Sequence, residues 1–210
     1  MSDARQEHWN SIFTTKAGNA VSWFQAIPET SLRLIRTCGL PKDASILDAG
    51  AGASHLPDAL LAEGFSNITV LDISAAALAK TRARLGDKGQ TVRFIVADLA
   101  AWKPDLTVDL WHDRAVLHFL TEKRDRAAYA DALRRAVRPG GFVVISGFAP
   151  SGPERCSGLP VLRADQNAIA TLLGPDFDRL DAFEEDHQTP SGGRQRFVFT
   201  RFRRRGSQSL

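Results

Sequence analysis

The residues best suited to chemistry lie in a loop of small residues that follows an apolar strand. Residues 46–54 read I-L-D-A-G-A-G-A-S, so Asp48 ends the strand and Gly50 and Gly52 follow it. Glycine lets the backbone approach a ligand closely and adopt dihedral angles that a side chain would forbid. The Asp48 carboxylate can accept hydrogen bonds from cationic or hydroxyl groups of that ligand. The segment therefore predicts a turn that binds a cofactor.

A second carboxylate follows at the spacing of a nucleotide-binding unit. Asp72 ends the next apolar strand. It lies about 20 residues beyond the glycines, which is the position of the ribose-binding carboxylate in a nucleotide-binding β-α-β unit. The cofactor is therefore predicted to contain a nucleoside.

The elements that position these carboxylates alternate in a regular order. Strands are predicted near 45–50, 68–72, 91–97, 107–113 and 142–148, and helices near 54–63, 74–85 and 121–137. This alternation favours a parallel sheet with helices on both faces, and ligands then bind at the carboxyl ends of the strands. After residue 148 a helix is predicted near 164–173. Two alternating segments, near 179–185 and 196–202, then flank the turn P-S-G-G and indicate a hairpin. The predicted fold class is α/β, with an antiparallel pair at the end of a mostly parallel sheet.

The chain has 210 residues, 43% of them hydrophobic, which suffices for one well-buried α/β domain. We expect a single domain over residues 1–210. Helices near 4–15 and 29–38 precede the first strand and are expected to form an amino-terminal lid within residues 1–40. Residues 44–148 form the expected cofactor-binding core. Residues 149–205 supply a loop, a helix and the hairpin on the acceptor side, and residues 206–210 form a polar tail.

Composition excludes several classes of protein. The formal charge is only +3 and much of the excess lies at 194–205, so nucleic acid is an unlikely partner. Cys38 and Cys156 lie far apart and no His/Cys cluster suggests a metal. The amino terminus carries mixed charge, and no apolar run approaches the roughly 18 residues of a membrane span. We therefore expect a reduced, cytoplasmic protein with neither a metal nor a membrane partner.

Residues 44–148 resemble the class I S-adenosylmethionine-dependent methyltransferases, a Rossmann-like family whose seven-stranded sheet ends in such a hairpin. D-A-G-A-G at 48–52 resembles the first motif of the family, D-I at 72–73 the ribose-binding segment, and A-D-L at 97–99 the segment that lines the adenine. The resemblance implies S-adenosyl-L-methionine as the cofactor. The implied cofactor-binding residues are Asp48, Gly50, Ala51, Gly52, Asp72, Ile73, Asp98 and Leu99. Trp23 is expected to clamp the cofactor or wall its pocket.

Two rival nucleotide-binding motifs fit less well. The family motif often has a third glycine where this chain has Ser54, a departure that many members share. A nicotinamide-binding G-x-G-x-x-G would need glycine at 55, where His55 would obstruct the approach of helix and strand. No G-x-x-x-x-G-K-S/T is present, which disfavours a P-loop nucleotide hydrolase.

Candidate residues for the acceptor side come from strand ends and loops. Asp113 ends the fourth strand, where it positions the acceptor or takes a proton, or else pairs with Arg114. His118 is read as either catalytic or structural, whereas His112 and Trp111 are predicted to be packing residues. The remaining acceptor-side candidates are Trp9, Arg114, Cys156 and His187.

The leading functional hypothesis is methyl transfer from S-adenosyl-L-methionine to a small nucleophile: a thiol, an amine or a carboxylate. The segments E-H-W-N at 7–10, V-S-W-F at 21–24 and G-F-S-N-I-T-V-L-D-I-S at 64–74 resemble a branch that includes elongation-factor lysine methyltransferases and uncharacterised bacterial relatives. A protein lysine is therefore the alternative acceptor. A non-catalytic nucleoside-binding protein is a further alternative.

Overall fold

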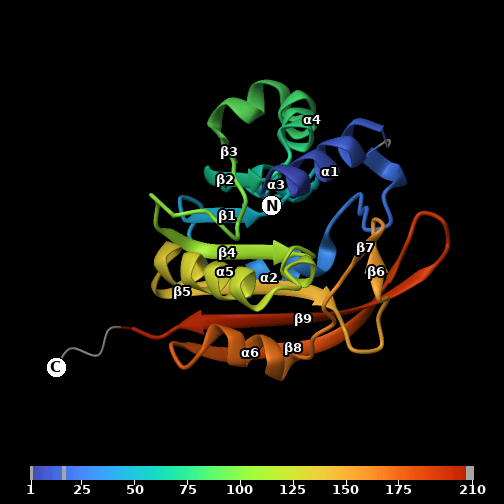
Figure 1. Ribbon diagram of the computed structural model, residues 1–210. Coiled ribbons are helices and arrows are strands. Elements are labelled where there is room, and N and C mark those ends of the chain that lie inside the picture. Colours follow the sequence, from blue (N-terminus) through green and yellow to red (C-terminus); the bar gives the residue numbers. More distant parts are fainter. Residues whose placement is uncertain (1, 16–17, 207–210) are drawn as a thin grey trace.

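The central element is a seven-stranded sheet, seen in a computed structural model that describes residues 2–15 and 18–206 (Figure 1). Its strands are β1 (Ser45–Ala49), β2 (Asn67–Asp72), β3 (Arg93–Val96), β4 (Val108–Arg114), β5 (Val137–Phe148), β8 (Phe177–Gln188) and β9 (Arg194–Arg204). They lie in the order β3-β2-β1-β4-β5-β9-β8. The first five are parallel, whereas β9 runs antiparallel to both β5 and β8. The predicted fold class is confirmed.

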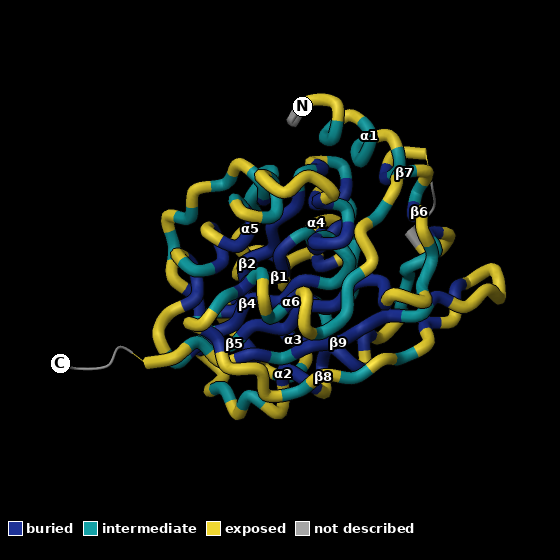
Figure 2. The backbone as a smooth tube through the Cα atoms, turned by 60° about the horizontal axis from the view of Figure 1, so that its bottom comes forward, coloured by how far each residue is buried: buried dark blue, intermediate teal, exposed yellow. Residues whose placement is uncertain are grey.

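Helices cover both faces of this sheet because its inner strands are apolar on both sides. On one face lie α2 (Glu29–Arg36), α3 (Leu56–Ala62) and α4 (Ala75–Leu85), whose apolar side chains pack on Ile46, Val70 and Leu110. On the other lie α5 (Lys123–Ala136) and α6 (Gln166–Leu173), packed on Leu47, Trp111 and Ile145. Figure 2 shows the central strands as the buried part of the molecule. Burial on both faces is what a parallel sheet requires.

Two departures from the predicted elements lie near β5. The strand begins at Val137, directly after α5, so the sequence P-G-G at 139–141 lies within the strand. The pairing of β4 with β5 shifts register between Val108 and Leu110, which accommodates those residues. A small hairpin of β6 (Arg155–Cys156) and β7 (Leu159–Pro160) was not predicted, because two-residue strands carry no periodic pattern.

The amino-terminal helix α1 (Ser2–Thr15) lies against α4, at the carboxyl ends of β2 and β3 (Figure 1). Asn10 Oδ1 accepts a hydrogen bond from the Ser74 hydroxyl at 2.8 Å, at the start of α4. Gln6 Nε2 donates to the Ile73 carbonyl at 3.1 Å. These contacts hold the helix over the end of the sheet where a cofactor was expected.

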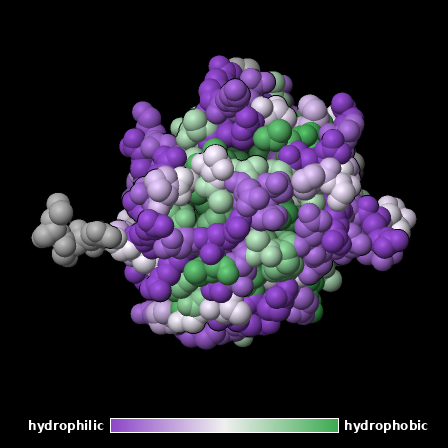
Figure 3. All heavy atoms as spheres, turned by 90° about the horizontal axis from the view of Figure 1, so that it is seen from below, coloured by the Kyte–Doolittle hydropathy of each residue, from purple (hydrophilic) through white to green (hydrophobic). Residues whose placement is uncertain are grey.

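Several arginines near the carboxyl end of the chain form ion pairs with carboxylates of β8. Arg196 forms an ion pair with Glu184, Arg201 with Asp181, and Arg205 with Asp178, all between β9 or its end and β8. Figure 3, which views the molecule from below, shows mostly hydrophilic side chains with scattered hydrophobic ones. Apart from Gly206, the expected tail lies outside the described residues. Within the described ranges no helix has the length and apolar character needed to cross a membrane.

Candidate functional site

A cavity of about 160 Å³ opens at the carboxyl ends of β1, β2 and β4, under α1 and the loop that follows it. Most of the residues chosen from the sequence line it: Trp9, Trp23, Asp48, Gly50, Ala51, Gly52, Asp72, Ile73, Asp98, Leu99, Arg114 and Cys156. Asp113, His118 and His187 are not among the lining residues. The motifs at 48–52, 72–73 and 97–99 therefore converge on one place.

The glycine loop runs along the cavity in a conformation that other residues rarely adopt. Gly50 has φ +72° and Gly52 has φ +57°, both in the left-handed region. A Cβ on Gly50 would overlap Val116 Cγ2, and one on Gly52 would lie 2.8 Å from the Phe13 ring. The loop is held to β2 by the Gly50 and Ala51 amides, which donate to the Leu71 carbonyl. Glycine is thus required by both conformation and space.

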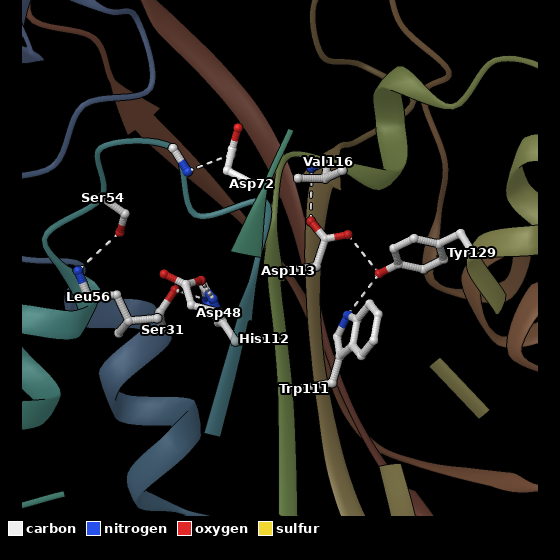
Figure 4. Close-up of polar contacts among 11 residues, drawn as sticks. Ser31, Asp48, Ser54, Leu56, Asp72, Trp111, His112, Asp113, Val116 and Tyr129 are labelled. Carbon is white, nitrogen blue, oxygen red and sulfur yellow. Dashed lines mark hydrogen bonds and ion pairs between the residues drawn. The ribbon is translucent and has the colours of Figure 1, made fainter. Parts of the chain in front are cut away.

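Asp48 is oriented by a chain of two hydrogen bonds. His112 Nδ1 donates to Asp48 Oδ1 at 2.7 Å, and in the neutral ring Nε2 accepts from the Ser31 hydroxyl at 2.9 Å (Figure 4). Asp48 Oδ2 is buried and has no hydrogen-bond partner among the described residues. A buried acceptor of this kind is costly unless a ligand supplies a donor. The arrangement fits the ammonium group of a bound methionine moiety.

Asp72 is fixed by the backbone around it. Its Oδ2 accepts from the Gly52 amide at 2.7 Å and its Oδ1 from the Ser74 amide at 2.7 Å. Burial raises the pKa of this carboxyl to about 6, although the two amides oppose the shift. Each oxygen keeps a second lone pair, so the carboxylate can accept from two ribose hydroxyls without losing these bonds.

Asp98 is engaged by the amino-terminal helix. Arg5 Nη2 lies 2.9 Å from Asp98 Oδ2, and Arg5 Nη1 lies 3.0 Å from Asp125 Oδ2 on α5. Asp98 Oδ1 also accepts from the Ala100 amide. Arg5 was not predicted to take part. The helical spacing could have indicated Arg5 as a site residue, because Arg5, Trp9 and Phe13 are each four residues apart and all line the cavity.

Arg114 brings a positive charge into the cavity wall. Its Nη1 donates to the Trp23 carbonyl at 2.8 Å, and its Cζ lies 5.1 Å from the centroid of the Phe197 ring. Its Nε and Nη2 are buried and have no hydrogen-bond partner among the described residues. Burial lowers the pKa of Arg114 to about 10, so the guanidinium remains charged at neutral pH.

Asp113 lies on the opposite side of β4 from the cavity, contrary to its predicted placement beside the methyl group. It is fully buried and accepts hydrogen bonds from the Tyr129 hydroxyl at 2.7 Å and from the amides of Val116 and Leu117 (Figure 4). Trp111 Nε1 donates in turn to the Tyr129 oxygen. Neither a catalytic role nor an ion pair with Arg114 is supported. These contacts make Asp113 an anchor for the turn after β4.

The two other histidine candidates also lie outside the cavity lining. His118 Nδ1 accepts from the Phe148 amide at 3.3 Å, and burial lowers the pKa of the ring to about 3. His187 Nε2 donates to the Ser22 carbonyl at 2.8 Å, and burial lowers its pKa too. Both rings are therefore neutral at physiological pH. Conversely, His112 lines the cavity, although the sequence predicted it to be a packing residue.

Known proteins resemble this chain in sequence over its core. Residues 46–141 match the methyltransferase-domain family. The chain is 32% identical over 157 residues to the ubiquinone/menaquinone biosynthesis C-methyltransferase UbiE of Coxiella burnetii. That match covers 72% of this chain, and this chain spans only 59% of the length of that relative.

Shorter matches are to methyltransferases named for different acceptors. EEF1A lysine methyltransferase 2 of Danio rerio is 30% identical over 122 residues, which cover 55% of this chain and 52% of that protein. Trans-aconitate 2-methyltransferase of Azoarcus sp. is 34% identical over 114 residues, which cover 53% of this chain and 42% of that protein.

A solved structure shares the fold along almost the whole chain. The N-methyltransferase NodS from Bradyrhizobium japonicum, in complex with S-adenosyl-L-homocysteine, superposes with a TM-score of 0.71 at 17% identity. The superposition covers 94% of this chain and 98% of NodS. The matched family domain spans the glycine loop, Asp72 and Asp98. It therefore includes the motifs on which the resemblance was based. The chain therefore contains a methyltransferase domain and has the fold of the class I S-adenosyl-L-methionine-dependent methyltransferases.

Proposed function

We propose that this protein transfers a methyl group from S-adenosyl-L-methionine to a small-molecule acceptor. The observation that carries the proposal is the way the amino-terminal segment covers the cavity. Trp9 and Phe13 of α1, and Trp23, Phe24 and Pro28 of the following loop, all line it. An acceptor held under this cover is a small molecule rather than a side chain on an exposed protein surface.

The cofactor supplies a methyl group on a sulfonium, and the chain has to hold it, align it and exclude water. Asp48 Oδ2 accepts from the ammonium group, and the loop at 50–52 follows the methionine part. Asp72 accepts from the ribose hydroxyls, and Asp98 and Leu99 lie at the adenine. Alignment at contact distance contributes up to about 7 to 11 kcal/mol to lowering a barrier. The aromatic cover serves this alignment and keeps water from the reacting atoms.

A protein lysine is the second candidate acceptor. Its support is the match to the Danio rerio lysine methyltransferase, together with the resemblance of the flanks at 7–10 and 64–74. The match to trans-aconitate 2-methyltransferase of Azoarcus sp. instead favours a small acceptor.

A labelling experiment separates these acceptors. Cell extract is divided into a protein-free fraction and a dialysed protein fraction, and each is incubated with the enzyme and methyl-labelled S-adenosyl-L-methionine. We expect label in a small-molecule product and none in protein. Asp72→Ala, which removes the ribose acceptor, is the inactive control. Label confined to a protein band would contradict the proposal. Binding of S-adenosyl-L-homocysteine with label in neither fraction would favour the non-catalytic alternative.

A further inference from the structure

The charge of Arg114 narrows the class of acceptor. We infer that the acceptor is an organic acid and that the Nε–Nη2 edge of Arg114 binds its carboxylate. The inference rests on the proposed function, because it concerns the acceptor end of the same cavity. It depends on the guanidinium lacking a counter-charge, on the direction in which it is held, and on the part of the cavity that it faces.

The two carboxylates whose charges act on Arg114 have hydrogen-bond partners of their own. Glu185 accepts from the Thr30 hydroxyl with both carboxylate oxygens, at 2.7 and 3.0 Å. Asp48 is hydrogen-bonded to His112. Among the described residues no carboxylate lies within ion-pair distance of Arg114. A buried charge without a partner is strongly unfavourable, so an anionic ligand would stabilise the wall of the cavity as well as being bound by it.

The guanidinium is held in one orientation. Nη1 donates to the Trp23 carbonyl, and Cζ lies over the Phe197 ring. The edge formed by Nε and Nη2 is left with both N–H groups unpaired among the residues described. Two parallel N–H donors match the two oxygens of a carboxylate, which is the strong, bidentate form of this interaction.

The position of Arg114 favours the acceptor over the cofactor as the source of the carboxylate. Trp23, Phe197 and the Cys156 thiol surround it, and they lie on the β5–β9 side of β4. The glycine loop and Asp72, which hold the cofactor in our proposal, lie on the β1–β2 side. The cavity also has an apolar wall that includes Trp9, Phe119 and Leu159. An acid with an apolar or unsaturated body suits this combination.

Binding of simple acids tests the inference without knowledge of the natural acceptor. The probes are acetate, fumarate and benzoate, with benzamide as the uncharged counterpart of benzoate. They are titrated by calorimetry into protein loaded with S-adenosyl-L-homocysteine. At least one acid should bind, benzamide should bind at least about tenfold more weakly than benzoate, and Arg114→Gln should weaken acid binding by about tenfold or more. Arg203→Gln, which removes an arginine of β9 outside the cavity lining, should leave acid binding unchanged.

A second titration identifies which carboxylate Arg114 holds. S-adenosyl-L-homocysteine and 5′-methylthioadenosine, which lacks the amino-acid part, are titrated into wild type, Arg114→Gln and Arg114→Lys. Affinities within about twofold for both nucleosides support the inference and show that the variants are folded. A selective loss for S-adenosyl-L-homocysteine would assign Arg114 to the cofactor and overturn it. Failure of every acid to bind the wild type, or equal binding to Arg114→Gln, would also overturn it. A small-molecule product formed equally well by Arg114→Gln would do so while leaving the proposed function intact.

Discussion

The two faces of β4 differ in whether their buried polar atoms have hydrogen-bond partners. Trp111 and Asp113 point toward Tyr129 of α5, whereas His112 points toward Asp48 (Figure 4). His112 and Arg114 both line the cavity. On the first face every polar atom of the network from Trp111 through Tyr129 to Asp113 has a partner. On the cavity face, Asp48 Oδ2 and the Nε and Nη2 of Arg114 are without one among the described residues.

This difference separates a structural network from a binding site. A buried network whose donors and acceptors are all paired fixes the backbone, and it has no free polar atom with which to bind a ligand. A buried polar atom that lacks a partner costs free energy in the unliganded protein, and a ligand that pairs with it recovers that cost. Polar character at a strand end therefore does not identify a catalytic residue. Unpaired polar atoms on residues that line the cavity mark the binding residues instead.

The largest effect expected is a loss of stability when the hydrogen-bond network on the α5 face of β4 is broken. Asp113→Ala leaves the Tyr129 hydroxyl and the amides of Val116 and Leu117 buried without an acceptor. The free energy of unfolding should fall by about 3 to 5 kcal/mol, measured by urea denaturation. Tyr129→Phe removes the two hydrogen bonds of the Tyr129 hydroxyl, to Trp111 and to Asp113, and should cost about 1 to 3 kcal/mol.

Asp113→Asn distinguishes a structural from a catalytic role, since it keeps the shape of the side chain. Turnover per folded molecule should stay within a few-fold of the wild type, whereas loss of a general base costs about 100-fold or more. A folded Asp113→Asn protein with such a loss would restore the prediction that Asp113 acts on the acceptor.

On the cavity face, the largest effect is expected at the glycine loop. In Gly50→Ala the new methyl group overlaps Val116, in a backbone conformation that disfavours any side chain. The loop has to move, and the affinity for S-adenosyl-L-homocysteine should fall by about 100-fold, or about 2.7 kcal/mol.

Gly39→Ala is the matched control for Gly50→Ala. Gly39 also has a positive φ, of +62°, but nothing lies within 4 Å of its added Cβ. This variant should lose about 1 kcal/mol of stability and no affinity. The double variant Gly50→Ala/Val116→Ala should recover part of the binding. Equal affinity losses in the two single variants would mean that backbone strain, and not the approach of Val116, sets the requirement for glycine.

His112 should have a smaller effect, exerted through Asp48. His112→Ala removes the hydrogen bond that orients the carboxylate, and the affinity for S-adenosyl-L-homocysteine should fall by about 10- to 30-fold, as measured by calorimetry. Adenosine, which lacks the ammonium group, should bind as it does to the wild type. Ser31→Ala should lower the affinity less, because His112 keeps its bond to Asp48. A similar loss for adenosine would show that the variant disturbs the whole site.

The sequence was sufficient for the parts of the fold and site that depend on local pattern. The apolar periodicity of 45–148 predicted the sheet, and the glycines with Asp72 and Asp98 predicted residues that line one cavity. Period-2 alternation separates Asp113 from His112 and Arg114 on the two faces of β4, although Asp113 and Arg114 were both predicted on the acceptor side. It could not say which face was turned to the cavity, because that depends on how α2 and α5 pack.

The sequence also could not predict the hydrogen bonds and ion pairs between segments that are far apart in the chain. The bonds from Arg5 to Asp98, from Ser31 to His112 and from Arg114 to Trp23 join residues far apart in the chain. No local signal predicts such bonds. The β6–β7 hairpin was missed for a different reason, since its two-residue strands are too short to show a period.

The smallest effect expected is a pH dependence of nucleoside binding through Asp72. Ribose hydroxyls donate to the ionised carboxylate, whose pKa in the unliganded protein is raised to about 6 by burial. Binding is therefore strongest above that pH and weakens as the carboxyl becomes protonated below it. Adenosine affinity, measured by calorimetry, should fall by about fourfold between about pH 8 and about pH 5.5. Asp72→Asn should bind more weakly at high pH and lose this dependence. A wild-type profile that is flat over this range would place the titration of Asp72 below it, and the carboxylate would then be kept ionised by the Gly52 and Ser74 amides despite its burial.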